Sequence, residues 1–557
     1  MSPVLADRVG RAIADGAEEL FGRQRPDGAF TDDPPGSTLG TAGAITALHA
    51  ADPHGSAALI DGGLAWLRAR QLPDGGWGGV DGAPAEPVAT SVAVAALHRI
   101  APGDAGDAVT AGRDWLATHG GVEAVTDPAV NHLCRQFLAL AGLPEAGTMR
   151  RLPLEVVHSD TIRRRRVSFR TAPFLALALL QSATAPPGPL RRLTQRGAIP
   201  VALRLLRTID AHENHTGDFS EDPWPAALVC LGLSISGHLP GVVAGTAGFL
   251  RRSVRPDGGW DAVTNLDLTR SAFAATGLIA AGYATDPRLN ATRDLLHRTQ
   301  QSTPFDVLGV PAGGWSYCCG HGWPVTLESA EILTALAGLP GAATDPALRS
   351  GLDWLIGRQD TRGSYSLWVR DTRLANDGPC PAITAQGITA LREAGHDVSS
   401  PPVTAAATWL LTQQRPDGTF ENLWYRDHTS GTAMVVDALV LAGHAGHPAV
   451  AKARDWLLRT QLADGTWGPG DGSPGSVEET AWALHALLAA GEPAGPDSPA
   501  DRAAGALIDA QRPDGGWPAA RVCAYIRHHM HYPNGAITRA LALRALAAFR
   551  RAQETTA

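Results

Sequence analysis

One short segment recurs along this chain and limits what it can fold into: a glutamine followed by an Asp-Gly turn and an aromatic residue. We call this segment the Gln–Trp turn. Its copies are QRPDGAF at 24–30, QLPDGGW at 71–77, VRPDGGW ending at Trp260, QDTRGSY at 359–365, QQRPDGTF ending at Phe420, QLADGTW at 461–467 and QRPDGGW at 511–517. Copies in the C-terminal half lie roughly 50 residues apart, the length of a repeat made of two helices. The spacing therefore predicts a helical repeat protein.

Each Gln–Trp turn has the same neighbours. A stretch with helical apolar spacing, such as Ala453–Gln461, precedes it, and an Ala/Leu-rich stretch such as Thr480–Gly491 follows it. The turn glycine accepts a positive φ and ends the first helix. We expect the glutamine amide to bond free backbone groups there, and the tryptophan to cover the turn, burying about 150–250 Å². These tryptophans are predicted to hold the fold and not to form a substrate cage.

The repeats predict an all-α fold of two α/α-barrel domains, because small Ala-rich inner helices pack closely in a ring. Copies thin out between Pro144 and His215, which separates an N-terminal from a C-terminal group. We predict that residues 31–290 form the N-terminal-half barrel, and that residues 291–557 form the C-terminal barrel.

Composition excludes several classes of protein. The 557 residues carry a net charge of -8, which argues against a nucleic-acid-binding surface. No apolar run reaches the roughly 18 residues of a spanning helix. The six cysteines lack framework spacing and the start lacks a signal sequence, so a cytoplasmic protein is expected. A peripheral membrane contact and the oligomeric state stay open. No Asp-rich magnesium motif or phosphate-binding glycine loop occurs, so no cofactor is predicted.

Three longer segments extend the pattern. They are GGVEAVTDPAVNHLCRQFLALAG at 120–142, LPLEVVHSD with VSFRTAPFLALALL within 152–180, and AYIRHHMHYPNGAITRALALRAL at 524–546. Together with the Gln–Trp turns they resemble the squalene–hopene cyclase family over nearly the whole chain. The resemblance implies two α/α-barrels, with residues 1–30 packing with the C-terminal barrel. It also implies an apolar cavity for a hydrophobic isoprenoid, and cyclisation started by protonating a terminal alkene.

The family's acid motif, Asp-x-Asp-Asp-Thr-Ala, matches Val325–Ala330 of this sequence. Leu327 stands where the family has its proton donor, and only Glu328 keeps a carboxyl group. The family's Asp-Val-Thr-Ala-His corresponds to Ala382–Gln386, so the aspartate becomes Ala382 or Ile383 and the histidine becomes Gln386. The usual proton delivery is therefore predicted to be absent.

Other carboxylates of the chain could replace the missing aspartate as the proton donor. Glu328 is the first candidate, and its structural alternative is a helix-start glutamate stabilised by the helix dipole. Asp267 is assigned to the preceding repeat and the other barrel, and Glu478 with Glu479 is interpreted mainly as helix-start chemistry. Glu328 is the predicted catalytic residue.

The predicted substrate-binding residues are mostly aromatic, because π-faces stabilise carbocations. They are Trp315, Tyr317, Trp323, Leu327, Ile383, Gln386, Trp424, Tyr425, Tyr525 and Tyr532. Aromatic residues make up only 6% of the chain, and most tryptophans belong to turns, which favours a short cascade or none.

Three other groups of residues were considered. Cys318, Cys319 and His321 do not form a closed tetrahedral set. His528, His529 and His531 suggest a metal, but the resemblance implies a Tyr/His-rich segment that packs near the cavity here, so no metal is predicted. The basic run Arg163–Arg166 is interpreted as a solvated face, with anionic lipid or diphosphate binding as the alternative.

The sequence thus favours a divergent terpene cyclase-like enzyme acting on a polyprenyl or prenylated substrate. It would start the reaction with a weaker acid on a more basic group, such as an epoxide, or would take an activated substrate. Two alternatives stay open: an isoprenoid-binding protein without chemistry, and a prenyl-chain isomerase.

Overall fold

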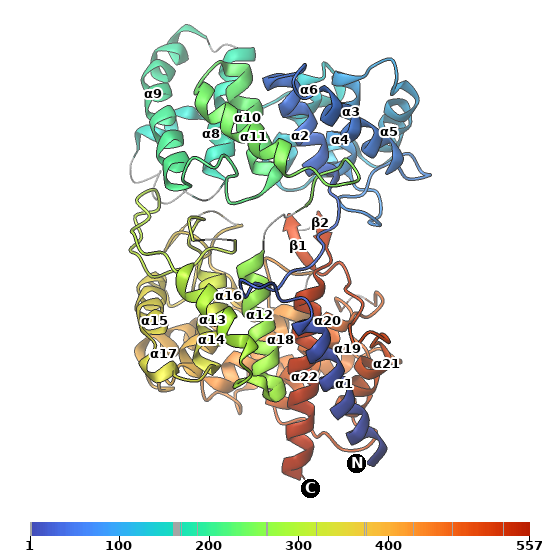
Figure 1. Ribbon diagram of the computed structural model, residues 1–557, viewed down its shortest axis with the longest axis vertical. Helices are drawn as coiled ribbons and strands as arrows, with labels where there is room; N and C mark the ends of the chain where they lie inside the picture. The colour runs from blue at the N-terminus through green and yellow to red at the C-terminus, as the bar shows by residue number, and fades with distance from the viewer. Residues whose placement is uncertain are drawn as a thin grey trace. The chain divides into compact units, whose positions relative to one another are not determined.

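The protein is mainly helical in the computed structural model (Figure 1). The structure describes residues 3–159, 168, 170–185, 188–262, 266–318, 320–372, 374, 376–426, 428–470, 472–526 and 529–556. These residues form two compact units. Unit 1 comprises Met1–Asp33, Leu266–Ala524 and Pro533–Ala557, and unit 2 comprises Pro34–Asn265 and Tyr525–Tyr532.

Unit 1 is built from two series of helices that alternate along the chain. The inner helices are α12 (Asp267–Leu278), α14 (Thr326–Gly338), α16 (Pro381–Glu393), α18 (Thr429–Leu441), α20 (Val477–Ala489) and α22 (Gly535–Thr556). The outer helices are α1 (Pro3–Phe21), α13 (Arg288–Arg298), α15 (Pro346–Arg358), α17 (Pro401–Leu411), α19 (Pro448–Thr460) and α21 (Pro499–Asp509). The short helices η4 (Ile279–Tyr283) and η5 (Ala342–Thr344) complete the unit. Each inner helix packs against the next, and α22 returns to α12, so the inner ring closes.

The glutamines of the Gln–Trp turns close the outer ring. Gln461 donates from Nε2 to the carbonyl of Gly465 in its own turn, at 3.0 Å, and to that of Pro499 at the start of α21, at 2.9 Å. Gln511 does the same with Gly515 and with Ala12 of α1. Equivalent pairs of bonds start from Gln300, Gln359 and Gln414, while Gln24 bonds Arg288 and Thr292 of α13. Each bond joins one repeat to the next until the chain returns to α1.

The turn tryptophans have the structural role predicted for them. The Trp467 ring is fully buried, and its Nε1 donates to the Leu457 carbonyl of the preceding helix at 2.7 Å. The Trp467 backbone N–H donates to Thr480 Oγ1 on the following inner helix at 3.0 Å. Trp77 and Trp260 make both kinds of bond in unit 2. The turn therefore fixes the register of the next inner helix.

Unit 2 is less regular. Its inner helices are α2 (Thr38–Ala51), α4 (Pro87–Ile100), α6 (Pro128–Leu140), α8 (Thr171–Thr184) and α10 (Pro223–Ser236). Around them lie α3 (Ala57–Ala69), α5 (Gly106–Thr118), α9 (Pro189–His212) and α11 (Pro240–Arg252), with the short helices η1 (Gly121–Ala124), η2 (Pro144–Ala146) and η3 (Leu154–His158). Helix α10 packs against both α8 and α2, and the turn at Trp260 bonds Thr41 of α2. These contacts bring the last repeat of the unit back to its first.

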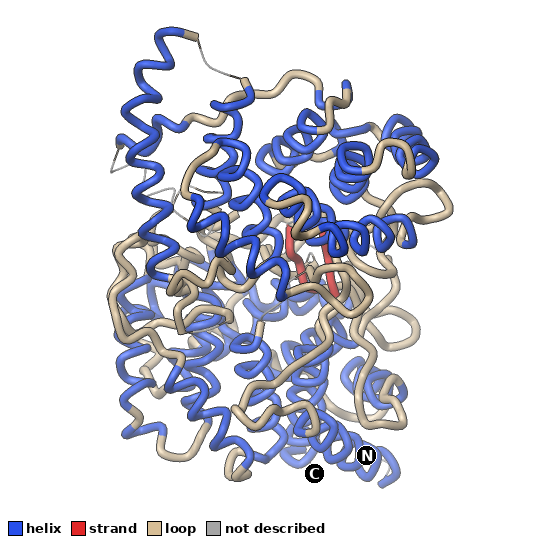
Figure 2. The backbone as a smooth tube through the Cα atoms, turned by 45° about the horizontal axis from the view of Figure 1, so that its top comes forward, coloured by secondary structure: helices blue, strands red, loops and turns tan. Residues whose placement is uncertain are grey.

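The structure differs from the expectation in two places. Strands β1 (Cys523–Ile526) and β2 (Met530–Tyr532) form a two-stranded sheet, so the chain is mainly helical but not all-helical (Figure 2). The units divide between Asn265 and Leu266, whereas the predicted boundary fell after residue 290. Helix α12 belongs to unit 1 because it packs tightly on α22: a Cβ at Gly277 would lie 2.7 Å from the carbonyl oxygen of Ala540. Among the described residues, no helix is both long and apolar enough to cross a membrane.

Candidate functional site

Glu328 lies in the first turn of α14, at the position that the sequence singled out. Two backbone bonds fix the start of this helix: Val325 N–H donates to the Trp315 carbonyl at 2.8 Å, and Thr326 N–H donates to the Leu367 carbonyl at 3.0 Å. The Glu328 side chain is only 7% exposed and accepts a hydrogen bond from Thr269 Oγ1 on α12 at 3.2 Å. The acid is therefore buried in the inner ring of unit 1.

Burial raises the pKa of Glu328 to about 7, and the nearby carboxylate of Glu331 raises it further. The hydrogen bonds from the backbone and from Thr269 oppose the shift only in part. Near pH 7 a large fraction of the molecules therefore keeps a proton on this carboxyl group. A carboxylic acid of this strength can donate a proton to a basic oxygen more readily than to an alkene.

Glu331 is a second buried acid, one helical turn after Glu328, and the sequence analysis missed it. It is 8% exposed, and Gln386 of α16 donates a hydrogen bond from Nε2 to its Oε1. Burial raises the pKa of Glu331 to about 7, against the effects of Arg544 and of the Gln386 bond. Gln386, predicted from the resemblance, thus binds a carboxyl group that matches no part of the family motif.

Hydroxyl residues on the inner helices mark which positions face the interior of the ring. The turn aromatics donate their backbone N–H to Ser329, Thr384, Thr432 and Thr480, and Phe30 donates to Ser271. The residues two positions after these hydroxyl residues are Phe273, Glu331, Gln386, Met434 and Trp482. The residues five positions after them include Thr334, Thr389, Asp437 and His485. The nine residues at these two positions line one cavity inside unit 1, together with Ala385, Ala433 and Arg544.

The residues five positions after the turn-bonded hydroxyls include a charged cluster. Arg544 of α22 donates to Asp437 of α18 at 3.0 Å, and His485 Nε2 of α20 lies 3.5 Å from the same carboxylate. Burial disfavours ionisation of Asp437, but His485 and Arg544 outweigh it and hold the pKa of this carboxyl below its ordinary value. Asp437 is therefore the fixed negative charge of the ring interior.

The predicted aromatic residues of unit 1 fall into two groups. Trp315 is fully buried and bonds the Leu296 carbonyl through Nε1 at 2.6 Å, the contact made by turn tryptophans. Trp323 packs with Phe305 and Trp368, with ring centroids 4.9 and 6.3 Å away. Tyr317 reaches the same Trp368 at 6.5 Å. The aromatic cluster next to the acid motif therefore includes Trp368, which the sequence analysis did not name.

The other predicted residues of unit 1 lie on neighbouring elements. Ile383 is fully buried on α16, and Leu327 is half-buried on α14. Tyr425 packs edge-on against Trp482, with centroids 4.8 Å apart, and the carbonyl of the half-buried Trp424 accepts the Ala524 N–H at 2.8 Å. Trp482 therefore contacts Tyr425 and also lines the cavity that contains Glu331.

The competing carboxylates have other roles. Asp267 lies in unit 1, although the sequence assigned it to the other barrel, and forms ion pairs with Arg25 and Arg270 at 2.7 and 3.6 Å. Glu479 pairs with Arg426 and completes the N-terminal cap of α20 with Ser476. Glu478 is buried and accepts bonds from Thr538 and the Ala520 N–H, and burial raises its pKa to about 7.

Tyr525 and Tyr532 belong to unit 2. Tyr525 donates from its hydroxyl to Asp222 Oδ2 at 2.7 Å, and Asp222 also caps α10 by accepting the Trp224 N–H at 3.1 Å. Burial raises the pKa of Asp222 to about 7, against both hydrogen bonds. No local sequence pattern indicates this pair, because its members are 303 positions apart. Tyr532 is buried.

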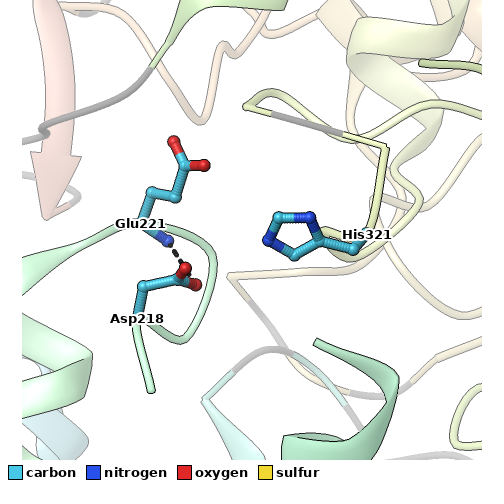
Figure 3. Close-up of side chains that lie close together, drawn as sticks. All are labelled: Asp218, Glu221 and His321. Atoms are coloured by element: carbon cyan, nitrogen blue, oxygen red, sulfur yellow. Dashed lines mark hydrogen bonds between the residues drawn. The ribbon is translucent and has the colours of Figure 1, made fainter. Parts of the chain in front are cut away.

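The segment before Asp222 has a strained backbone. Phe219, Ser220 and Glu221 have φ values of 46°, 68° and 58°, a region that non-glycine residues rarely adopt. The Glu221 N–H donates to Asp218 Oδ1 at 3.1 Å and helps to hold the turn (Figure 3). Asp222 therefore follows directly on a strained turn of unit 2.

Several sequence candidates for metal or anion binding lie outside the described residues. They are Cys319, His528 and Arg163–Arg166. Cys318 is buried, and His321 is half-buried.

Comparisons with known proteins agree with the fold. Residues 267–550 match the model of the squalene-hopene cyclase C-terminal domain, and residues 13–159 match that of the N-terminal domain. Drimenyl diphosphate synthase of Streptomyces showdoensis is 26% identical over 404 residues, which cover 67% of this chain and 71% of that protein. Squalene--hopene cyclase of Bradyrhizobium diazoefficiens is 28% identical over 261 residues, 40% of this chain and 39% of that protein. The solved ent-copalyl diphosphate synthase of Streptomyces platensis superposes with a TM-score of 0.59 at 21% identity, over 97% of this chain and 99% of the other.

Proposed function

Because this chain belongs to the squalene–hopene cyclase family, we propose that it is a divergent class II terpene cyclase in which Glu328 replaces the usual aspartate acid. The substrate is a polyprenyl or prenylated molecule, held by the aromatic residues predicted above. The two-barrel architecture and the loss of the Asp-x-Asp-Asp motif are parts of the same proposal.

The observation that carries the proposal is the state of Glu328. It is a buried carboxyl group with a pKa of about 7, on the helix that matches the family's acid motif. The Thr269 bond leaves one carboxyl oxygen in a fixed position, so the other can present its proton in a defined direction. A protonated carboxyl in a water-poor site is the group that acid-initiated cyclisation requires.

The strength of this acid limits the substrate. Clustered aspartates can protonate an alkene, but a carboxyl group with a pKa of about 7 is much weaker. An epoxide oxygen is more basic than an alkene, and its protonation opens the ring and creates the cation that a neighbouring alkene attacks. We therefore propose a terminal epoxide of a prenyl chain as the preferred substrate group.

A product screen with purified protein tests the proposal. Squalene, farnesyl diphosphate, geranylgeranyl diphosphate and their terminal epoxides are incubated separately and analysed by mass spectrometry. Diphosphates are included because relatives such as drimenyl diphosphate synthase are named for diphosphate products. We expect a cyclised product from at least one epoxide.

The Glu328→Gln variant then tests the acid. It should lose roughly 10²–10⁴-fold in turnover while substrate affinity is kept, because the amide fills the same space without a labile proton. Glu554→Gln, an exposed site on α22, is the matched control. Full activity of Glu328→Gln would exclude Glu328 as the initiator. Binding without any product favours an isoprenoid-binding protein, and an uncyclised rearranged product favours a prenyl-chain isomerase.

A further inference from the structure

The carboxyl group of Glu478 is held differently from that of its neighbour Glu479. Glu478 is 2% exposed, and its Oε1 accepts hydrogen bonds from Thr538 Oγ1 at 2.6 Å and from the Ala520 N–H at 2.9 Å. Its Oε2 is also buried but accepts no hydrogen bond from any residue that the structure describes. Glu479, by contrast, forms an ion pair with Arg426. Glu478 thus keeps one carboxyl oxygen free in a buried place.

Helical spacing shows which face of α20 carries Glu478. Trp482 and His485 of this helix both line the cavity inside the ring. Glu478 stands four residues before Trp482 and seven before His485, which is about one and two helical turns, so it lies on the same interior face. The corresponding residues of four other inner helices are Thr269, Leu327, Ala382 and Ser430. Glu478 is therefore the only carboxyl group among these five interior positions.

Glu328 and Glu478 lie on opposite sides of the ring. Both are in the first turn of their helix, and an outer helix returns the chain between successive inner helices, so both lie at the same end of the ring. Helices α16 and α18 separate α14 from α20 on one side, and α12 and α22 separate them on the other. Inner helices that pack about 8–10 Å apart place opposite axes of a six-helix ring about 16–20 Å apart. The two acids therefore meet different parts of a bound chain.

Two aromatic rings accompany Glu478. Trp482 follows it by one helical turn on the same face, and Tyr425 packs edge-on against Trp482 with ring centroids 4.8 Å apart. Tyr425 also pairs with Cys523 in an isolated β-bridge, three residues after the Ala520 N–H that holds Glu478. The face of an aromatic ring attracts a cation within about 6 Å of its centre. A carbocation formed beside these rings is therefore stabilised near the free oxygen of Glu478.

We propose that Glu478 is the base that ends the cyclisation, and that its carboxylate takes the proton from the final carbocation beside Tyr425 and Trp482. The inference rests on the proposed function, in which Glu328 starts the reaction. Burial raises the pKa of Glu478 to about 7, which makes its carboxylate a stronger base than that of an ordinary glutamate. One ring thus carries an acid on α14 and a base on α20.

Bonds and protons balance over one turnover. Glu328 gives its proton to the epoxide oxygen, which the product keeps as a hydroxyl group. The final cation loses a proton from the carbon next to the cationic carbon, and the electrons of that C–H bond form a C=C bond. Glu478 Oε2 binds this proton. The product is an isomer of the substrate, and exchange with solvent returns both carboxyl groups to their starting states.

The products of the Glu478→Gln variant test the base. The probe is the terminal epoxide of geranylgeranyl diphosphate, and its products are identified by mass spectrometry. In a single turnover the variant should consume the probe within about three-fold of the wild-type rate, because Glu328 is intact, while the share of the wild-type alkene falls at least about ten-fold in favour of isomeric alkenes or alcohols formed with water. An unchanged product mixture would overturn the proposal. Glu328→Gln should instead abolish consumption, so failure of the base and failure of the proposed function are distinguishable.

A stable cation tests the base even if the probe epoxide is not converted. Farnesyldimethylamine carries a positive charge on a prenyl chain at pH 8, where Glu478 is mostly ionised, and its binding is measured by calorimetry. Glu478→Gln should weaken this binding at least about ten-fold, because the amide keeps the shape of the side chain and loses its charge. Neutral farnesol should bind the variant and the wild type equally, which shows that the variant is folded, and Glu554→Gln is the matched control. Equal affinity of the amine for Glu478→Gln and the wild type, or no binding to the wild type, would overturn the proposal.

Discussion

The two units use the same turn but differ in how completely it closes a ring. In unit 1, glutamine bonds join each outer helix to the next, from α1 through α13 to α21 and back to α1. In the described part of unit 2, Gln71 makes this bond, to Ala108 of α5, and Val254 stands where the copy ending at Trp260 would have its glutamine. Other contacts also hold unit 2 together, such as the Arg255 pair with Asp261 and the Asp222 cap of α10.

The difference teaches what a closed ring permits. In unit 1 the turns fix the register of every inner helix, so the interior positions are set by the scaffold and their side chains can vary. That is where the charged cluster of Asp437, His485 and Arg544 is found. The buried acids Asp222 and Glu86 of unit 2 lie at helix N-termini, as Glu328 and Glu478 of unit 1 do, whereas Asp437 lies inside its helix.

The largest expected effect comes from removing a turn tryptophan in one unit at a time. Trp467→Ala should destabilise unit 1 by about 3–5 kcal/mol, because it leaves a cavity and removes the bond to Leu457. Trp77→Ala should do the same to unit 2 through the matching bond to Leu67. Hydrogen exchange read by mass spectrometry should show lost protection only in the mutated unit. Equal loss in both units would mean that they unfold together.

The next effect is a pH dependence that tests the buried acids of the two units. The folded pKa of Glu331 is about 7, above the ordinary 4.5, so at low pH the carboxyl is protonated in both folded and unfolded chains. As the pH rises from 4.5 to 7 the unfolded chain ionises first, so stability falls, by about 3 kcal/mol in total. In unit 2 burial raises the pKa of Glu86 to about 8, so the loss of stability caused by this group extends to a higher pH.

Glu331→Gln and Glu86→Gln should therefore raise stability relative to the wild type at pH 8 much more than at pH 4. Urea unfolding at the two pH values measures the difference. A pH-independent effect in the Glu331→Gln variant would show that this carboxyl is ionised in the folded chain.

The smallest expected effect tests ring closure itself. Gln511→Ala removes the bond from the last turn to Ala12 of α1 and the bond to Gly515 within the turn, and should cost about 2 kcal/mol. Gln71→Ala removes the same two kinds of bond in unit 2 and serves as the comparison. If ring closure contributes stability, the variant in unit 1 should also expose α1 to exchange. Equal costs without exposure of α1 would limit the glutamine to a local role.

Sequence analysis found the repeats and the acid motif because both are local patterns. It missed Glu331 and Asp437, which stand among apolar residues of Ala/Leu-rich helices, where periodicity alone does not tell which face lines the interior. Aligning the helices on their turn-bonded hydroxyls, such as Thr432 and Thr480, would have shown both as interior positions. No such alignment finds the bond between Tyr525 and Asp222, because it joins distant segments.

The sequence by itself determined the helical repeat, the role of the turn tryptophans and the family of the chain, because each depends on residues close together in the sequence. The tertiary structure decided which unit α12 joins, that Gln386 binds Glu331, and that five helices bring charged or amide side chains to one cavity. It also decided the raised pKa of Glu328, because a value of about 7 depends on the burial supplied by the folded ring. The physical reason is that burial and long-range contacts form only when distant segments pack, and no single stretch of sequence records them.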